Sequence, residues 1–208
     1  MNVTAIIVTR GDHDLSDILD SLPTEWERIV WDNGFHGYPH ADIYKDGNDW
    51  RPDGPPGEVR DLSVYGRYAA IEYAKGDLIY VQDDDVLVRD PQAIVRGWNR
   101  YESMDHVVCN MPQEFRHSFY EDHALVGFGA CFHRDAPRRA FERMPWPEHF
   151  VRTCDIVFTS LTPRVLVDVP KRNLPWANDD NRMWMQPKHQ AERSRMLDLC
   201  KEARYART

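Results

Sequence analysis

The sequence has no apolar run near the roughly 18 residues that cross a bilayer, and none of its four cysteines forms a Cys-x-x-Cys pair. The first absence excludes a membrane-spanning helix, and the second excludes zinc-finger spacing. The cysteines stand at least 22 positions apart among apolar neighbours, which predicts buried free thiols in a reducing compartment. No signal-peptide pattern opens the chain. We therefore expect a cytoplasmic protein without a membrane span.

Charge is distributed unevenly along the 208 residues. Residues 1–113 hold 10 basic and 21 acidic side chains, whereas residues 114–208 hold 16 basic and 13 acidic ones. The acidic first half disfavours a protein that coats nucleic acid, while the basic second half is compatible with an anionic partner. The length is typical of one domain, and the aromatic content of 12% is too high for a disordered chain. We expect a single domain over residues 1–208.

Hydrophobic periodicity predicts alternating strands and helices in the first half. The segments with these patterns are 3–9, 15–22, 28–31, 62–75, 77–83 and 91–101. This order predicts an α/β fold with right-handed crossovers, in which a mostly parallel central sheet carries helices on both faces. The second half predicts a smaller mixed region, with strands at 106–111, 124–132 and 164–169 and a C-terminal helix over 190–203. Within the first half, between the segments 28–31 and 62–75, residues 35–60 are rich in Gly, Pro, Asp and His, which is typical of a functional loop, with one short strand near 43–44.

Three adjacent acids, Asp83, Asp84 and Asp85, end the apolar strand predicted at 77–83. In an extended segment Asp83 and Asp85 project from one face and Asp84 from the other. Adjacent carboxylates repel one another unless a positive charge neutralises them, and Mg²⁺ or Mn²⁺ prefers such oxygen ligands. Open α/β sheets also bind ligands at the carboxyl ends of their strands. The run therefore predicts a divalent-metal site, with a solvated acidic turn as the alternative.

Polar residues also follow the first two strands. Thr9 and Arg10 end the first strand, and Asp32 begins an Asp-Asn-Gly turn after the second. Asp32 can accept a hydrogen bond from a base, while Thr9 and Arg10 can contact a base or ribose; ordinary turn chemistry is the alternative. Arg67, in the helix before the acidic strand, offers a planar fork for a pyrophosphate, or else is an ion-paired helix residue.

The sequence from residue 66 to residue 85 resembles the centre of GT-A-fold glycosyltransferases, particularly those of family 2. Those enzymes show an Arg-bearing helix, a small residue followed by Gly, a hydrophobic strand and an Asp-x-Asp motif. Residues 66–71 (Gly-Arg-Tyr-Ala-Ala-Ile) and 74–85 (Ala-Lys-Gly-Asp-Leu-Ile-Tyr-Val-Gln-Asp-Asp-Asp) fit this pattern. The opening at 5–10 and the turn at 32–34 fit it as well, so the resemblance covers about residues 3–90 and is thin beyond them.

The resemblance implies a nucleotide-sugar site in the first half. It puts Asp32 on the base, Arg67 near the diphosphate, Asp83 near the ribose or sugar with Asp84 beside the donor, and Asp85 on a Mn²⁺ or Mg²⁺ ion.

In the second half, residues 125–134 resemble the Gly-rich strand that lines the sugar pocket in such enzymes, which implies that Gly129 and Ala130 lie near the donor. Family 2 enzymes usually carry a Glu-Asp pair whose Asp is the catalytic base. Here the Glu is missing and Asp155 is the candidate base, with a helix N-cap as the alternative. In many metal-dependent GT-A enzymes a His late in the sequence binds the metal, and His189 is the best match here. Asp179 and Asp180 are alternative candidates for the catalytic base or for the metal ligand.

These features imply a metal-dependent glycosyltransferase that moves a sugar from a UDP- or GDP-sugar to an acceptor hydroxyl. Residues 1–113 would bind the donor, and residues 114–208 the acceptor. A glycan, a protein or a modified DNA base remain open as acceptors. The alternatives are a nucleotidyltransferase acting on sugar phosphates, a metal-dependent hydrolase, and a non-catalytic module that binds sugar or nucleic acid.

Overall fold

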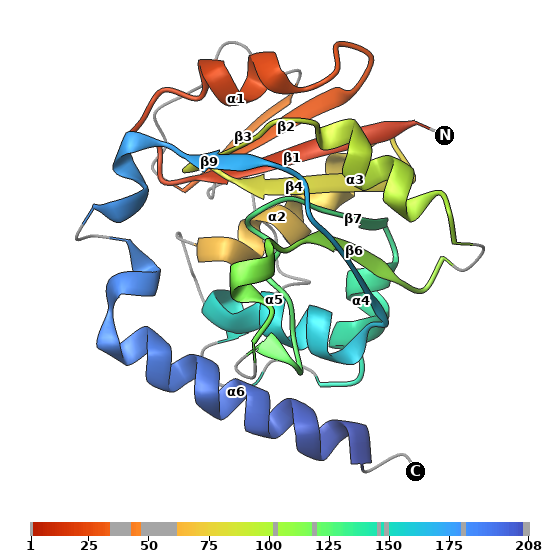
Figure 1. Cartoon of the computed structure of the whole chain (residues 1–208), viewed down its shortest axis with the longest axis vertical. Coiled ribbons are helices and arrows are strands. Elements are labelled where there is room, and N and C mark those ends of the chain that lie inside the picture. The colour runs from red at the N-terminus through yellow and green to blue at the C-terminus, as the bar shows by residue number, and fades with distance from the viewer. Residues whose placement is uncertain are drawn as a thin grey trace.

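The centre of the molecule is a seven-stranded sheet with the strand order β3-β2-β1-β4-β7-β6-β8 (Figure 1). The computed structural model of the chain describes residues 2–33, 43–46, 62–101, 104–117, 120–144, 147, 150–179 and 182–205. The strands of the sheet are β1 (Val3–Thr9), β2 (Glu27–Asp32), β3 (Ile43–Asp46), β4 (Leu78–Asp83), β6 (Val107–Asn110), β7 (Ala130–His133) and β8 (Arg164–Val167). A separate antiparallel pair joins β5 (Val86–Val88) to β9 (Lys171–Asn173).

Strands β1 to β4 are mutually parallel, β7 runs antiparallel to β4 and β6, and β8 is parallel to β6. The predicted mostly parallel sheet is therefore confirmed. Every residue of β1 is buried, because neighbouring side chains such as Ile6 and Ile7 enter apolar cores on opposite faces of the sheet.

Helices cover both faces of the sheet, as predicted. They are α1 (Ser16–Ser21), α2 (Gly66–Ala69), α3 (Pro91–Trp98), α4 (Ala136–Phe141), α5 (Phe150–Leu161) and α6 (Pro187–Tyr205). Side chains of α1 and α3 belong to one core, while those of α2, α4, α5 and α6 belong to the other. The long α6 lies along α5 at the outer edge of the molecule (Figure 1).

Two predicted elements differ from the structure. The helix expected over 62–75 is a single α-helical turn, α2, flanked by the 3₁₀ turns η2 (Ser63–Tyr65) and η3 (Ala70–Tyr73), since apolar spacing alone does not separate these helix types. The strand expected over 124–132 begins only at Ala130, because Gly129 has a φ of +104° and residues before it turn toward the end of β4. The short strand near 43–44 is confirmed as β3, while the rest of the stretch 35–60 lies outside the described residues.

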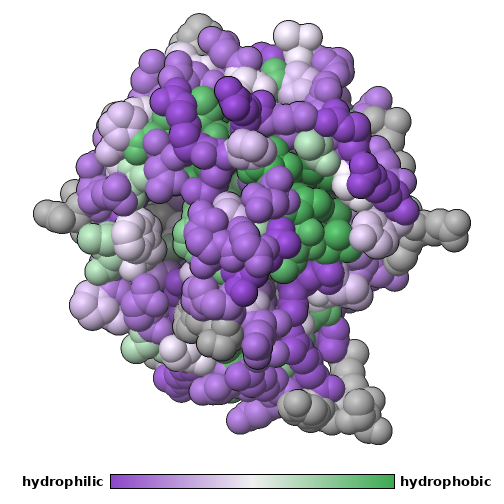
Figure 2. Space-filling model, viewed as in Figure 1, coloured by the Kyte–Doolittle hydropathy of each residue, from purple (hydrophilic) through white to green (hydrophobic). Residues whose placement is uncertain are grey.

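The sheet brings the polar strand ends together at one edge. Thr9 pairs with Asp32 across β1 and β2, and Val8 pairs with Asp83 across β1 and β4. On the face in Figure 2 hydrophilic side chains predominate and apolar ones gather in a smaller area. Within the part of the chain that the structure describes, no helix combines the length and the apolar character that a bilayer crossing needs.

Candidate active site

A cavity of about 590 Å³ lies at the carboxyl ends of β1 and β4. Its walls come from these strand ends, from residues 123–128, from α5, and from the segment 182–193 that leads into α6. Of the residues that the sequence singled out for chemistry, seven line it: Thr9, Arg10, Asp83, Asp84, Asp85, Asp155 and His189. Four others, Asp32, Arg67, Gly129 and Ala130, are not among its lining residues.

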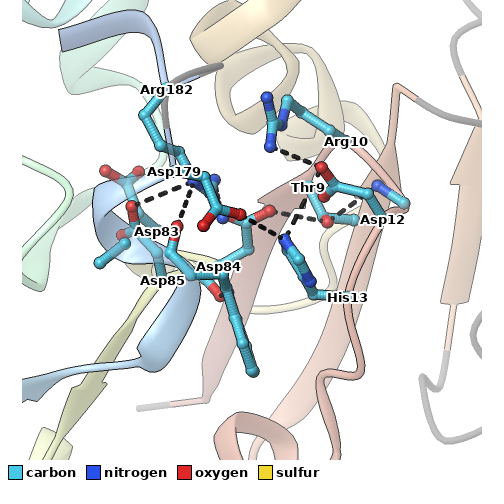
Figure 3. Close-up of polar contacts among 12 residues, drawn as sticks. Thr9, Arg10, Asp12, His13, Asp83, Asp84, Asp85, Asp179 and Arg182 are labelled. Atoms are coloured by element: carbon cyan, nitrogen blue, oxygen red, sulfur yellow. Dashed lines mark hydrogen bonds and ion pairs between the residues drawn. The ribbon is translucent and has the colours of Figure 1, made fainter. Parts of the chain in front are cut away.

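The three acids at 83–85, called the acidic turn below, divide between two cations. Asp84 is buried, accepts a hydrogen bond of 2.8 Å from the Thr9 hydroxyl, and lies 2.8 Å from Nη1 of Arg182 (Figure 3). Burial raises the pKa of the Asp84 carboxyl, and the contacts with Arg182 and Thr9 oppose that rise. Asp83 faces the other way and pairs with Arg67.

Arg182 is a site residue that the sequence reasoning missed. It is buried, its Nε lies 3.8 Å from Oδ2 of Asp85, and the same Nε donates to the carbonyl of Trp176. Its Nη2 has no hydrogen-bond partner among the described residues. The only sequence signal is a basic residue that closes the run Asn-Asp-Asp-Asn at 178–181, which does not indicate a partner almost a hundred positions away.

Asp85 is the least compensated acid of the turn. Its side chain is 14% exposed, and its pKa rises to about 7, first through burial and then through the charges of Asp83 and Asp84, against the effect of Arg182. The acidic turn and Asp155 together supply four carboxylates, whereas Arg67 and Arg182 supply two guanidinium groups. A divalent cation commonly takes one or two carboxylates together with substrate phosphates, and the acidic turn offers such oxygen ligands. Asp85 is the side chain best suited to hold it.

Arg67 is almost wholly buried, with 1% of its side chain exposed. Its Nη2 donates to Oδ1 of Asp83 at 2.6 Å, its Nη1 lies 3.4 Å from Oδ2 of Asp155, and its Nε donates to the carbonyl of Val64. Both carboxylates raise its pKa, so the guanidinium is always charged. Arg67 lies behind the carboxylates rather than in the cavity, so it orients them and offers no fork to a diphosphate.

Asp155 lies within α5, at its sixth residue, so the alternative of a helix N-cap is wrong. Its Oδ1 accepts a hydrogen bond of 2.6 Å from the Tyr68 hydroxyl, and its Oδ2 faces Arg67. Burial raises the pKa of Asp155, and the contacts with Arg67 and Tyr68 partly oppose this. A carboxylate that is held by two neighbours, lines a cavity and has a raised pKa is suited to accept a proton.

One predicted donor contact, Asp32, lies just outside the cavity. Asp32 is buried at the end of β2, and the next residue, Asn33, lines the cavity in its place. Asn33 is held by the Trp31 indole, which donates to its Oδ1, and by its own Nδ2, which donates to the carbonyl of Ser63. Arg10 lines the cavity and forms an ion pair with Asp12.

The Gly-rich segment meets the cavity at Gly127 and Phe128 rather than at Gly129 and Ala130, which belong to the turn into β7 and to its first position. A Cβ added to Gly127 would overlap the carboxyl group of Asp83. The backbone of Gly127 also accepts a hydrogen bond of 2.9 Å from the Asp83 amide. The absence of a side chain at 127 is therefore what lets Asp83 reach Arg67.

His189 lines the same cavity but lies among cations. Its Nδ1 is 3.7 Å from Oε2 of Glu192, and its pKa falls to about 4 through burial and through Arg193 and Arg152. Among the described residues, no three His, Cys, Asp or Glu side chains gather into a possible metal site. The structure thus does not join His189 to Asp85 as metal ligands, and its cationic neighbours disfavour a divalent ion there.

The remaining candidates are placed as follows. Asp179 lies 3.4 Å from Nε2 of His13 (Figure 3). The ring of His13 stacks on that of Trp176. Asp180 lies outside the described residues.

Comparison with known proteins shows the fold. No protein-family model matches the chain, and no curated protein sequence is significantly similar to it. The structure of glucosyl-3-phosphoglycerate synthase from Mycobacterium tuberculosis with Mn²⁺, UDP-glucose and phosphoglyceric acid matches with a TM-score of 0.62 and 11% identity, over 98% of this chain and 79% of that one. The structure of S. aureus TarS 1–349 with UDP matches with a TM-score of 0.55 and 13% identity, over 96% and 65% of the two chains. The fold is therefore that of GT-A glycosyltransferases.

The Gly127→Ala variant tests the contact between Gly127 and Asp83. The added methyl group displaces the Asp83 carboxyl and leaves the buried Arg67 with a poorer partner, so we expect a loss of about 3 kcal/mol in the free energy of unfolding. Urea denaturation measures it. Gly97→Ala is the matched control, because its new methyl group would meet only two valine methyl groups at 3.4 Å. Equal stability of the two variants would contradict the described contact.

The Asp85→Asn variant tests the charge excess of the acidic turn. Because the folded state raises the pKa of Asp85 to about 7, the wild type loses stability as pH rises from about 4 to about 7. Asparagine abolishes this loss, so the variant should be more stable than the wild type by about 2 kcal/mol at pH 8, and the gap should close toward pH 4. Urea denaturation at both pH values checks this, with the exposed Asp77→Asn as control. If the wild type were more stable than Asp85→Asn at pH 8, the raised pKa of Asp85 would be contradicted.

Proposed function

We propose that this chain is a metal-dependent glycosyltransferase that moves a sugar from a nucleotide-sugar donor to an acceptor hydroxyl. The observation that carries the proposal is that Asp85 and Asp155 line one cavity at the strand ends of a GT-A fold. The two matched structures contain UDP-glucose and UDP, which makes uridine nucleotides the first donors to test.

The donor would lie across the ends of β1 and β4. Thr9, Arg10 and Asn33 line that end of the cavity and carry hydrogen-bonding groups suited to a base and ribose. Asp32, buried beside Thr9, would support this strand end from beneath. Asp83, whose carboxyl group fills the space that Gly127 leaves, would contact the ribose or sugar.

The diphosphate would lie against the acidic turn. Asp85 is the proposed metal-binding side chain, and Arg182 holds Asp84 and Asp85 in place from the segment before α6. A bound Mg²⁺ or Mn²⁺ ion supplies positive charge to the departing nucleoside diphosphate. Arg182, which lines the cavity and keeps one Nη2 without a hydrogen-bond partner among the described residues, adds a second positive charge near the leaving group.

Asp155 would be the catalytic base. As the bond to the sugar breaks, the acceptor hydroxyl attacks and its proton passes to a carboxylate oxygen of Asp155. Tyr68 and Arg67 fix the orientation of that carboxylate, and its raised pKa makes it a better base than an exposed Asp. An inverting transfer requires a base of this kind, and Asp155 would supply it.

A nucleotide panel tests the donor and the metal together. We expect UDP-sugars with Mn²⁺ to raise the melting temperature more than GDP-, dTDP- or CDP-sugars do. A ligand at 100 times its Kd stabilises the folded state by about 2.7 kcal/mol, so the shift is measurable. The Asp85→Ala variant should lose the part of this rise in melting temperature that depends on Mn²⁺, and the Asp77→Ala control should retain it. Product analysis distinguishes the reactions: released UDP supports glycosyl transfer, whereas released pyrophosphate indicates a nucleotidyltransferase. A wild type that no nucleotide stabilises contradicts the proposal.

Asp155→Asn tests the base. We expect turnover to fall by about 10²–10⁴-fold, because the amide takes up no proton, while the affinity for UDP measured by calorimetry stays unchanged. Tyr68→Phe is the companion variant. Its lost hydrogen bond normally stabilises the charged carboxylate, so the acidic limb of kcat/KM should move to higher pH. Transfer at the wild-type rate in Asp155→Asn would assign the base elsewhere.

A further inference from the structure

Part of the lining of the cavity is basic. Four of its lining residues, called the basic wall below, come from three segments: His123 from the loop before β7, Arg152 from α5, and His189 and Arg193 from α6. Both imidazoles are buried. The cavity is thus lined by the acidic turn and by the basic wall, and the basic wall has no part in the proposed donor chemistry.

Contacts hold the guanidinium groups of the basic wall in place. Arg193 places its Nη2 3.4 Å from Nε2 of His123, and its guanidinium lies 5.8 Å from the centre of the Tyr120 ring. Arg152 donates to Oε1 of Gln186 at 3.2 Å, and its Nε lies 3.4 Å from Glu192. These contacts fix two planar forks at the edge of one cavity, and such forks suit phosphate and carboxylate groups.

Positive charge prevails around the two imidazoles. The pKa of His123 falls to about 3 and that of His189 to about 4, in each case first through burial and then through Arg193. The other main charges on them are those of Arg152, Arg164 and Arg204, opposed by Asp122 and Glu192. Four guanidinium groups therefore act against two carboxylates. Neutral imidazoles in such surroundings can still donate an N–H to an anion.

The basic wall also lies next to the proposed base. Arg152 and Asp155 are three residues apart on α5, a spacing that puts their side chains on the same side of a helix. The charge of Arg193 reaches Asp155 as well and lowers its pKa. A group held by this wall would be held close to the carboxylate that takes the acceptor's proton.

We propose that the basic wall binds an anionic group, a phosphate or a carboxylate, of a small acceptor molecule whose hydroxyl then faces Asp155. This inference rests on the proposed glycosyl transfer and adds the chemical class of its second substrate. Arg193 contacts the anion and selects the acceptor, while the acidic turn repels the same group and prevents its binding at the donor site. An acceptor of the same size without the charge would bind weakly.

The test uses the full chain saturated with UDP and Mg²⁺, so that the donor site is occupied. Glycerol 3-phosphate, glycerate, inorganic phosphate and glycerol are then added in turn, and the melting temperature and calorimetric affinity are measured. We expect stabilisation by at least one of the three anions and none by glycerol. The comparison of glycerol 3-phosphate with glycerate shows whether phosphate or carboxylate is preferred.

Arg193→Gln should weaken binding of the preferred anion at least tenfold and leave the affinity for UDP and Mg²⁺ unchanged. Arg152→Gln removes the second guanidinium group, which comes from α5, and should also weaken binding of the anion. Arg195→Gln is the matched control, since it removes the same charge from an exposed position two residues along α6. The inference would be overturned if Arg193→Gln and Arg152→Gln still bound the anion as the wild type does. It would also be overturned if glycerol stabilised the wild type as much as the anions do, or if none of the compounds stabilised it. Failure of the wild type to bind UDP contradicts the proposed function itself, and the acceptor inference falls with it.

Discussion

The buried guanidinium of Arg67 is the interaction on which the site depends. A charge that is almost wholly removed from water is tolerated only with close partners of opposite sign, and Asp83 and Asp155 supply them from β4 and α5. This one group therefore ties the acidic turn to the proposed base, across two elements 72 residues apart in the chain (155 − 83). The neighbouring Tyr68, on the same short helix, adds the hydrogen bond that completes the orientation of Asp155.

Two glycines make this arrangement possible. Gly127 leaves room for the Asp83 carboxyl, and Gly66 lets α2 lie directly against the indole ring of Trp31, where a Cβ would overlap the ring. Trp31 in turn donates to Asn33, which lines the cavity where β2 ends. Core packing and the positions of the polar side chains at the strand ends thus depend on each other. A substitution in either would alter the lining of the cavity.

Much of this structure could be predicted from local patterns. The apolar runs of β1 and β4 are buried on both faces. Such unbroken runs, together with the polar residues that directly follow them, indicate a parallel sheet and a site at its edge. Arg182 and Gly127 could not be predicted in this way, because their partners Asp84 and Asp83 lie far away in the sequence and no local pattern depends on them. Asp85 and His189 carry residue types that fit one metal site, but only the fold shows that cations surround His189.

The opposite charges of the acidic turn and the basic wall bear on how a transfer reaction can be ordered. An unligated acidic turn keeps an excess of negative charge, which disfavours an anionic group beside it until a cation arrives. The basic wall presents the reverse field, so a metal ion is directed toward Asp85 and an anion toward Arg193. Asp155 is held by Arg67 and influenced by Arg193, and its pKa responds to both. In the proposed reaction, a cavity with this polarity would hold two negatively charged substrates apart at their anionic groups, while their reacting atoms meet beside Asp155.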